Sequence, residues 1–427
     1  MSLLTLGVAA WLGAAIYQAP QSSSTGSSQS PKELTVLVVG DVGLNRADLK
    51  VHPDGVAESG NVLAWEEMTR GIEGLVNADV NFMNLETVVT DRNDLRRTNK
   101  RQSRPFMFRS HPIGVAHVLD LGFNLISLAN NHSYDYGAKG VRETLKHMYT
   151  LSVPRNLAYA GLGLSRAEAA QPSVLRVEGT DIAFSAVGAI TNMIAEHRAG
   201  PKKPGTLGFR FEDDWNLAVT NLREQKSPLR ILSVHYGKER DIRADAKQKK
   251  AFGQAVATGG IDLVVGHHAH VARGVEIRNG RVIFYGLGNF MIRGARDMGA
   301  SPKLIQCCDY GIAAKVHYKL GKRGRYAARA IEVFPLIDMH KSPKQRDARG
   351  GLKRIEVLNV LAEALDDKEL GARGVRFQAR RDGTGLYCAK GARRDSGAIG
   401  KLCKSYRRPT APTASTRARV RRAPKRR

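Results

Sequence analysis

Apolar residues recur along the chain in short runs that end in glycine or in polar residues, a pattern typical of buried strands. The run at 34–40, LTVLVVG, is rich in β-branched residues and ends at Gly40, as expected of a central strand covered on both faces. Similar runs predict strands at 80–85, 123–128, 229–234, 263–265, 311–318 and 327–334. Two further pairs of runs, 173–177 with 182–187 and 275–277 with 282–285, flank EGTD and RNGR and predict hairpins.

The segments between these strands carry apolar residues at helical spacing. They predict helices at 64–76, 111–121, 140–151, 212–225 and 246–258. Strands that alternate with helices and are followed by late hairpins indicate an α/β fold, a mixed sheet system with helices outside. We expect residues 32–338 to form this domain and residues 339–370 to form a linker with one amphipathic helix at 352–365.

The N-terminal segment, residues 1–31, has a different composition. The stretch at 3–17, LLTLGVAAWLGAAIY, contains no charge and is followed by a Ser-rich polar run. It is shorter than the roughly 20 residues of a full membrane span. It suits the apolar region of an export signal or signal anchor, although the usual preceding Lys or Arg is missing. A buried helix is the alternative. We expect a protein of the cell envelope, exported or membrane-anchored.

Positive charge is concentrated at the other end. The 427 residues carry a net charge of +27, and residues 371–427 contain 18 Lys or Arg against two acids, a net of +16. Such a segment attracts polyanions or an anionic membrane surface. Without apolar periodicity, it is expected to be mostly disordered. Nucleic acid is not an expected partner, because no recognition motif or interleaved aromatic residues accompany the charge.

The four cysteines form no C-x-x-C motif, so a zinc knuckle is not expected. Cys388 and Cys403 leave two alternatives open, a disulfide outside the cytosol or two free thiols.

Polar clusters follow five of the predicted strands. They are Gly40-Asp41, Asn84-Leu85-Glu86, Asn130-Asn131-His132, His235-Tyr236-Gly237 and Gly266-His267-His268-Ala269-His270. Open α/β sheets build their sites at the carboxyl ends of strands, so these side chains are expected to meet. A single Asp or His after a strand is usually structural, but five such clusters favour a metal site.

Carboxylate, amide and imidazole groups are ligands for Mn, Fe or Zn and can hold two ions close together. Thiols are missing from the set, which argues against a structural zinc site. In His268-Ala269-His270, strand-like spacing would place both rings on one side.

The order GDV, NLE, ANNH, VHYGKE, GHHAHV and YGLGNF, spread over residues 34–334, resembles the CapA, or poly-γ-glutamate capsule synthesis, family. That family is similar to calcineurin-type metallophosphoesterases. The resemblance implies a two-sheet β-sandwich flanked by helices that binds one or two divalent ions of Mn, Fe or Zn.

The resemblance also assigns roles. It implies that Asp41 and His270 bind one metal and that Glu86 is the bridging carboxylate. The second metal would be bound by Asn131, His235 and His268. His132 would be the catalytic proton donor. His267 is either a ligand in place of His268 or a side chain that supports the ligands. The same supporting or substrate-contacting role is expected for Asn130, Asn289 and Arg104.

Two positions depart from the phosphoesterase pattern. Position 43 is Gly43, so the D-x-H motif is missing and the first metal would lose one imidazole. Glu86 stands where ordinary metallophosphoesterases use Asp, which lengthens the bridge by one methylene. These departures put in doubt whether two ions bind tightly and whether the protein is an efficient phosphatase.

The segment 92–109 contains seven Lys or Arg residues. It is either a basic lip that recruits a polyanionic or phosphorylated substrate or a solvated loop. Phe106, Met107 and Phe108 are expected to anchor it to the core.

Two functions are therefore expected from different classes. The first is metal-assisted hydrolysis of a phosphoester or related bond during capsule polymer synthesis or export. The second is a non-catalytic accessory role in which the protein binds an anionic capsule polymer.

Overall fold

The computed structural model describes residues 31–45, 49–58, 61–101, 103, 105–188, 194–294 and 308–421. The expected apolar N-terminal segment, Arg104 and Cys307 lie outside this part of the chain. Within it, no helix is long and apolar enough to span a membrane.

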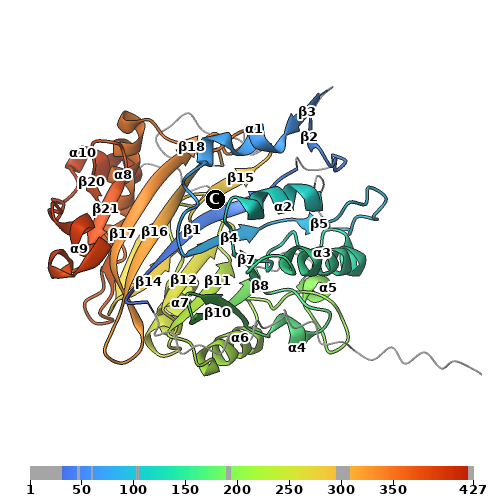
Figure 1. The fold of residues 1–427 in the computed structure, drawn as a ribbon, viewed down its shortest axis with the longest axis horizontal. Coiled ribbons are helices and arrows are strands. Elements are labelled where there is room, and N and C mark those ends of the chain that lie inside the picture. The colour runs from blue at the N-terminus through green and yellow to red at the C-terminus, as the bar shows by residue number, and fades with distance from the viewer. Residues whose placement is uncertain are drawn as a thin grey trace, which may run out of the picture.

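Two β-sheets pack face to face with helices on both outer surfaces, as Figure 1 shows. The first sheet has ten strands, with β20-β21-β17-β16-β1-β4-β7-β8 as its main path and β15 and β18 alongside β1 and β17. The second sheet has seven strands in the order β19-β13-β14-β12-β11-β10-β9. The expected two-sheet sandwich flanked by helices is confirmed.

The strands of the first sheet are β1 (Glu33–Gly43), β4 (Val80–Leu85), β7 (Leu125–Ser127), β8 (Ala158–Ala160), β15 (Asn289–Ile292), β16 (Tyr310–Leu320), β17 (Tyr326–Ile337), β18 (Lys344–Gln345), β20 (Gln378–Ala379) and β21 (Gly385–Cys388). Those of the second are β9 (Ser173–Val177), β10 (Thr180–Gly188), β11 (Leu229–His235), β12 (Leu263–His267), β13 (Val275–Arg278), β14 (Arg281–Phe284) and β19 (Arg373–Gly374). Two small sheets pair β2 (Gly55–Glu58) with β3 (Asn61–Ala64) and β5 (Val88–Val89) with β6 (Arg109–Ser110).

The helices are α1 (Trp65–Thr69), η1 (Arg70–Ile72), α2 (Pro112–Asp120), α3 (Gly137–Ser152), α4 (Arg166–Ala169), α5 (Ile194–His197), α6 (Glu212–Glu224), α7 (Ala246–Ala257), α8 (Ala348–Glu363), η3 (Ala392–Arg394), α9 (Gly397–Cys403) and α10 (Ala414–Arg421).

Successive side chains of the central strands point to opposite faces of the sheet, and each face packs against a different layer. Leu34, Val36 and Val38 of β1 face the second sheet and join the core between the sheets. Leu37 and Val39 face the opposite way and pack in the cluster that includes α2 and α3. The second sheet is covered in the same manner by α6 and α7. Both faces of β1 are therefore apolar, which explains its continuous hydrophobic run.

Parallel pairing brings the strand ends together. In the first sheet β1, β4, β7 and β8 are parallel neighbours, and in the second sheet β10, β11, β12 and β14 are. The polar clusters predicted from the sequence follow these strands, so both sheets deliver polar side chains to one end of the sandwich.

The expectation of a mostly disordered C-terminal tail is wrong for residues 373–421. Strand β21 pairs with β17, from Val333↔Gly385 to Ala330↔Cys388. Leu386, Ala392 and Ile399 form a small buried cluster, and Cys388 and Cys403 form a disulfide. The segment has few apolar residues among many charges, so its sequence shows no apolar periodicity. These few residues are enough to order the segment because they pack against the edge of an existing sheet. In the expected linker, α8 corresponds to the predicted helix.

Candidate metal centre

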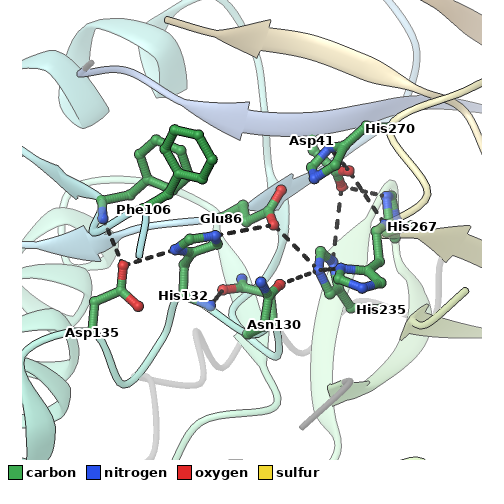
Figure 2. Close-up of polar contacts among 12 residues, drawn as sticks. Asp41, Glu86, Phe106, Asn130, His132, Asp135, His235, His267 and His270 are labelled. Carbon is green, nitrogen blue, oxygen red and sulfur yellow. Dashed lines mark hydrogen bonds and ion pairs between the residues drawn. The ribbon is translucent and has the colours of Figure 1, made fainter. Parts of the chain in front are cut away.

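The candidate site lies between the carboxyl ends of the two sheets. Asp41 belongs to β1, Glu86 follows β4 and Asn131 lies in the loop after β7, all in the first sheet. From the second sheet, His235 ends β11, and His268 and His270 follow β12. These six side chains are buried, and the structure brings the expected ligand set together (Figure 2).

One group of contacts centres on His235. Its Nε2 atom lies 2.6 Å from Asn131 Oδ1, 3.3 Å from Glu86 Oε1 and 3.1 Å from His268 Nδ1. These partners are the residues that the family resemblance implied for a second metal, together with Glu86, implied as the bridging carboxylate. Burial lowers the pKa of His235 to about 3 and the pKa of His268 well below its usual value. Both rings are therefore neutral, the form that binds metals.

A second group centres on Asp41. The Oδ2 atom of its carboxylate lies 3.4 Å from His270 Nδ1, and its Oδ1 atom lies 3.1 Å from His267 Nδ1. Although burial opposes ionisation, His267 and His270 hold the pKa of Asp41 well below its ordinary value. Burial also opposes a charge on His270, but the carboxylates of Glu86 and Asp41 raise its pKa to about 10.

Glu86 connects the two groups. Asp41, Glu86 and His235 offer ligand atoms within 4.8 Å of one another, and so do Glu86, His268 and His270. Both carboxylate oxygens of Glu86 are buried without a hydrogen-bond partner. Burial and the nearby Asp41 raise its pKa to about 7. A buried carboxylate without partners is costly unless a cation compensates it, so these residues fit a divalent cation.

The loop after β12 differs from the expected strand-like arrangement. His268 and His270 have φ values of 77° and 52°, in the left-handed region that residues other than glycine rarely adopt. Strained backbone of this kind costs about 1–3 kcal/mol per residue and concentrates at functional sites. The two rings thus reach the site through a tight loop, and the prediction from i, i+2 strand spacing is wrong.

His132 stands beside the ligand set rather than within it. Its Nδ1 atom lies 2.7 Å from Asp135 Oδ2, and its Nε2 atom lies 3.9 Å from Glu86 Oε1. Figure 2 shows the ring between Asp135 and Glu86. Burial lowers the pKa of His132. Nδ1 is held by Asp135 and Nε2 faces the site, an arrangement suited to proton transfer.

The remaining expected residues support this set. His267 contacts Asp41, and its ring lies tilted beside that of Phe82, with ring centroids 5.5 Å apart, so its position favours support of a ligand. Asn289 Oδ1 lies 2.8 Å from His270 Nδ1. Asn130 accepts a hydrogen bond from the backbone N–H of His132 and donates to the Leu85 carbonyl.

Gly40 allows a close approach between β1 and the backbone of the YGLGNF segment. A Cβ atom at Gly40 would overlap the carbonyl oxygen of Gly288, and Asp41 donates its N–H to that oxygen at 3.2 Å. At Gly43, a Cβ atom would lie 3.2 Å from Ile292 Cδ1. A larger side chain has little room there, and the missing imidazole has no direct replacement at this position.

Over its whole length, the basic segment 92–109 is neither a basic lip nor a solvated loop. Lys100 is buried, forms an ion pair with Asp135 and lies 3.2 Å from His132 Nδ1. Arg109 is buried as well and donates to backbone carbonyls. Arg96, Arg97 and Arg101 are exposed. Met107 and Phe108 anchor the segment as expected, but Phe106 is 47% exposed and stacks on Phe108.

Three further residues of the site had been given no role of their own from the sequence. Asn84 Nδ2 donates to Asp41 Oδ1 at 2.8 Å and lies 3.1 Å from His235 Nδ1. Lys100 carried no signal, because its contact with Asp135 depends on the loop fold. Glu239 lies at the exposed rim, and His270 and His268 lower its pKa against the effect of partial burial. Glu239 follows the HYG motif closely in the sequence, and this position could have indicated that it lies near the site.

Comparisons with known proteins agree with the motif order. Residues 35–293 match the family described as "Bacterial capsule synthesis protein PGA_cap". The PGA biosynthesis protein CapA of Bacillus subtilis (strain 168) is 27% identical over 350 residues, covering 79% of this chain and 82% of the relative. The capsule biosynthesis protein CapA of Bacillus anthracis is 26% identical over 322 residues, covering 73% and 69%.

A solved structure, the calcineurin-like phosphoesterase YfkN from Bacillus subtilis, aligns with a TM-score of 0.41 and 11% identity, covering 71% of this chain and 90% of that one. The family match spans more than half of the chain. The chain therefore belongs to the bacterial capsule synthesis protein family PGA_cap.

Proposed function

We propose that this protein is a metal-dependent hydrolase that acts on a phosphoester or related bond during synthesis or export of an anionic capsule polymer. The observation that carries the proposal is the buried carboxylate of Glu86, whose two oxygens have no hydrogen-bond partner and lie among three imidazoles. The link to capsule synthesis comes from the family and from relatives named for capsule and PGA biosynthesis.

Asp41, Glu86, Asn131, His235, His268 and His270 are the residues proposed to hold one or two divalent ions of Mn, Fe or Zn. Their mixture of carboxylate, amide and imidazole suits these metals. When bound, such ions supply Lewis-acid charge that stabilises negative charge on a reacting phosphoryl oxygen.

The protein's own groups supply proton transfer and exclusion of water. His132 presents Nε2 to the site and is proposed to protonate the leaving oxygen. Asp135 and Lys100 hold the opposite side of the ring. Because the ligands lie between two packed sheets, the donors are fixed before substrate binds, and little reorganisation is required.

A second function, a non-catalytic accessory role in binding anionic polymer, is favoured by one observation. Position 43 is a glycine packed against Ile292, so one imidazole of the phosphoesterase pattern is missing. An incomplete ligand set suits a site that binds metal weakly or does not turn over.

The test is metal analysis of the purified chain together with hydrolysis assays on phosphomonoester, phosphodiester and poly-γ-glutamate substrates. We expect bound Mn, Fe or Zn and hydrolysis of at least one substrate class, both lost in Glu86→Gln. Bound metal without hydrolysis of any substrate would favour the accessory role. No bound metal after incubation with each ion would exclude the hydrolase.

A further inference from the structure

One end of the first sheet carries a dense group of exposed cations. At this end β1 begins and the hairpin between β16 and β17 turns. The backbone N–H of Leu320 donates to the Lys32 carbonyl at 2.9 Å, and the N–H of Ala398 in α9 donates to Glu33 Oε2 at 2.9 Å. We call the following eight exposed residues the basic end face: Lys32, Lys322, Arg323, Lys390, Arg393, Arg394, Lys401 and Lys404.

The segments that form the basic end face contain little negative charge of their own. Segments 31–33, 319–324 and 389–404 contain two acids, Glu33 and Asp395. Asp395 is already paired with Lys319 at 2.8 Å and Arg329 at 2.7 Å. The eight cations form no ion pair with any residue that the structure describes. They therefore present a local positive field to any anionic surface nearby.

The surface is also rigid. The disulfide between Cys388 and Cys403 closes the segment that carries four of the eight cations, and Lys404 follows it directly. Ala392 and Ile399 are buried under this segment, and β21 is paired with β17. Figure 1 shows β21 and α9 together at the edge of the first sheet beside β17. Because the backbone that carries these cations is already held in place, binding to an extended anionic surface requires little ordering of the backbone.

The position of the basic end face relative to the N-terminal segment indicates the partner. The apolar stretch 3–17 is separated from Lys32 by residues 18–31, a polar Ser-rich run. The 14 residues between them can span at most about 50 Å, from roughly 3.6 Å per residue in an extended chain. An apolar segment inserted in a bilayer would keep the basic end face close to the lipid headgroups.

We propose that the basic end face docks on an anionic phospholipid surface and acts together with the apolar N-terminal stretch to hold the protein at the membrane. One apolar segment with a polybasic patch is the combination that gives stable peripheral attachment, and each Lys or Arg near an anionic surface contributes about 1 kcal/mol. This inference does not depend on the metal centre.

Docking at this face also fixes an orientation. Asp41 lies eight residues further along β1 than Glu33, which corresponds to about 26 Å at roughly 3.3 Å per residue. The candidate metal centre would therefore point away from the bilayer, toward polymer in the aqueous phase.

The experiment measures binding of the full chain to phosphatidylcholine vesicles with and without phosphatidylglycerol. The test variant combines Arg393→Gln, Arg394→Gln, Lys401→Gln and Lys404→Gln. The control variant combines Arg142→Gln, Lys146→Gln, Lys249→Gln and Lys250→Gln, which removes the same charge from exposed positions on α3 and α7. Thermal melting checks that both variants are folded.

We expect phosphatidylglycerol to increase binding of the wild type, with an increase that weakens at high salt. The test variant should lose roughly ten-fold or more of this increase, from about 1 kcal/mol per cation, whereas the control variant should keep it. Equal loss in both variants, or no dependence on phosphatidylglycerol, would overturn the proposal. It would also fail if the test variant lost binding to soluble poly-γ-glutamate but kept its binding to anionic vesicles.

Discussion

At the scale of single residues, the site separates groups placed to bind a cation from a group placed to move a proton. His235 Nε2 is surrounded by Asn131, Glu86 and His268 within 3.3 Å. His132 Nε2 is 3.9 Å from Glu86, and its other nitrogen is occupied by Asp135. This geometry agrees with the different roles that the family resemblance implied for the two imidazoles.

We predict that His235→Ala lowers the content of bound metal, whereas His132→Ala leaves metal bound and reduces hydrolysis. Loss of a general acid typically reduces the rate by about 10²–10⁴-fold. Metal analysis and turnover of the best substrate measure the two effects, with the half-buried His52→Ala, outside the site, as control. If His132→Ala lost metal as fully as His235→Ala, the proton-donor assignment would be wrong.

Lys100 is predicted to stabilise the protein through Asp135. The Lys100→Met variant keeps a similar volume but removes a buried positive charge, and breaking a buried pair typically costs about 3–5 kcal/mol. Urea unfolding measures this loss. The double variant Lys100→Met with Asp135→Asn should recover part of it, because the buried carboxylate is then neutral. No recovery would show that Lys100 acts through packing alone.

The strand-end positions of the ligands could be predicted, because a buried strand that ends in a polar residue is a local pattern. The contact of Lys100 with Asp135 could not be, since it joins two loops. The left-handed backbone of His268 and His270 was missed for a related reason. Its conformation is imposed by the surrounding sheet ends and not by the local sequence.

At the scale of secondary structure elements, the hydrophobic periodicity of the sequence predicted most strands and helices of the core. It did not predict the short strands and helices that follow α8. Strand β4 was predicted with its observed bounds, and both hairpins, β9–β10 and β13–β14, were predicted. The two-residue strands and β21 are too short to show alternation. Of these, β19 pairs with β13, and β18 and β21 pair with β17, so their formation depends on tertiary contacts.

The disulfide between Cys388 and Cys403 is predicted to stabilise this C-terminal segment. It closes a sequence separation of 15 residues, for which chain-entropy arguments give about 3 kcal/mol. The double variant Cys388→Ser with Cys403→Ser should therefore unfold at lower urea concentration. A reducing agent should lower the urea concentration at which the wild type unfolds to that of the double variant. Equal stability of the oxidised wild type and the variant would contradict the prediction.

At the scale of the whole molecule, the candidate metal centre joins the two sheets. Asp41, Glu86 and Asn131 come from the first sheet, and His235, His268 and His270 come from the second. A cation held by both sets would act as a cross-link between the layers. Without it, the charges of the site remain close together in a buried position, so occupancy of the site and stability of the sandwich should be coupled.

We predict that removing metal with a chelator lowers the Tm of the full chain and that adding back Mn, Fe or Zn restores it. A ligand that binds only the folded state stabilises it by about 2.7 kcal/mol at 100 times its Kd, and the increment should grow with metal concentration. Glu86→Gln should abolish this dependence because Glu86 connects both groups of ligands. His52→Ala, outside the site, should retain it. A Tm that is the same with chelator and with each metal would contradict the coupling, because a bound cation that bridges two sheets must stabilise their packing.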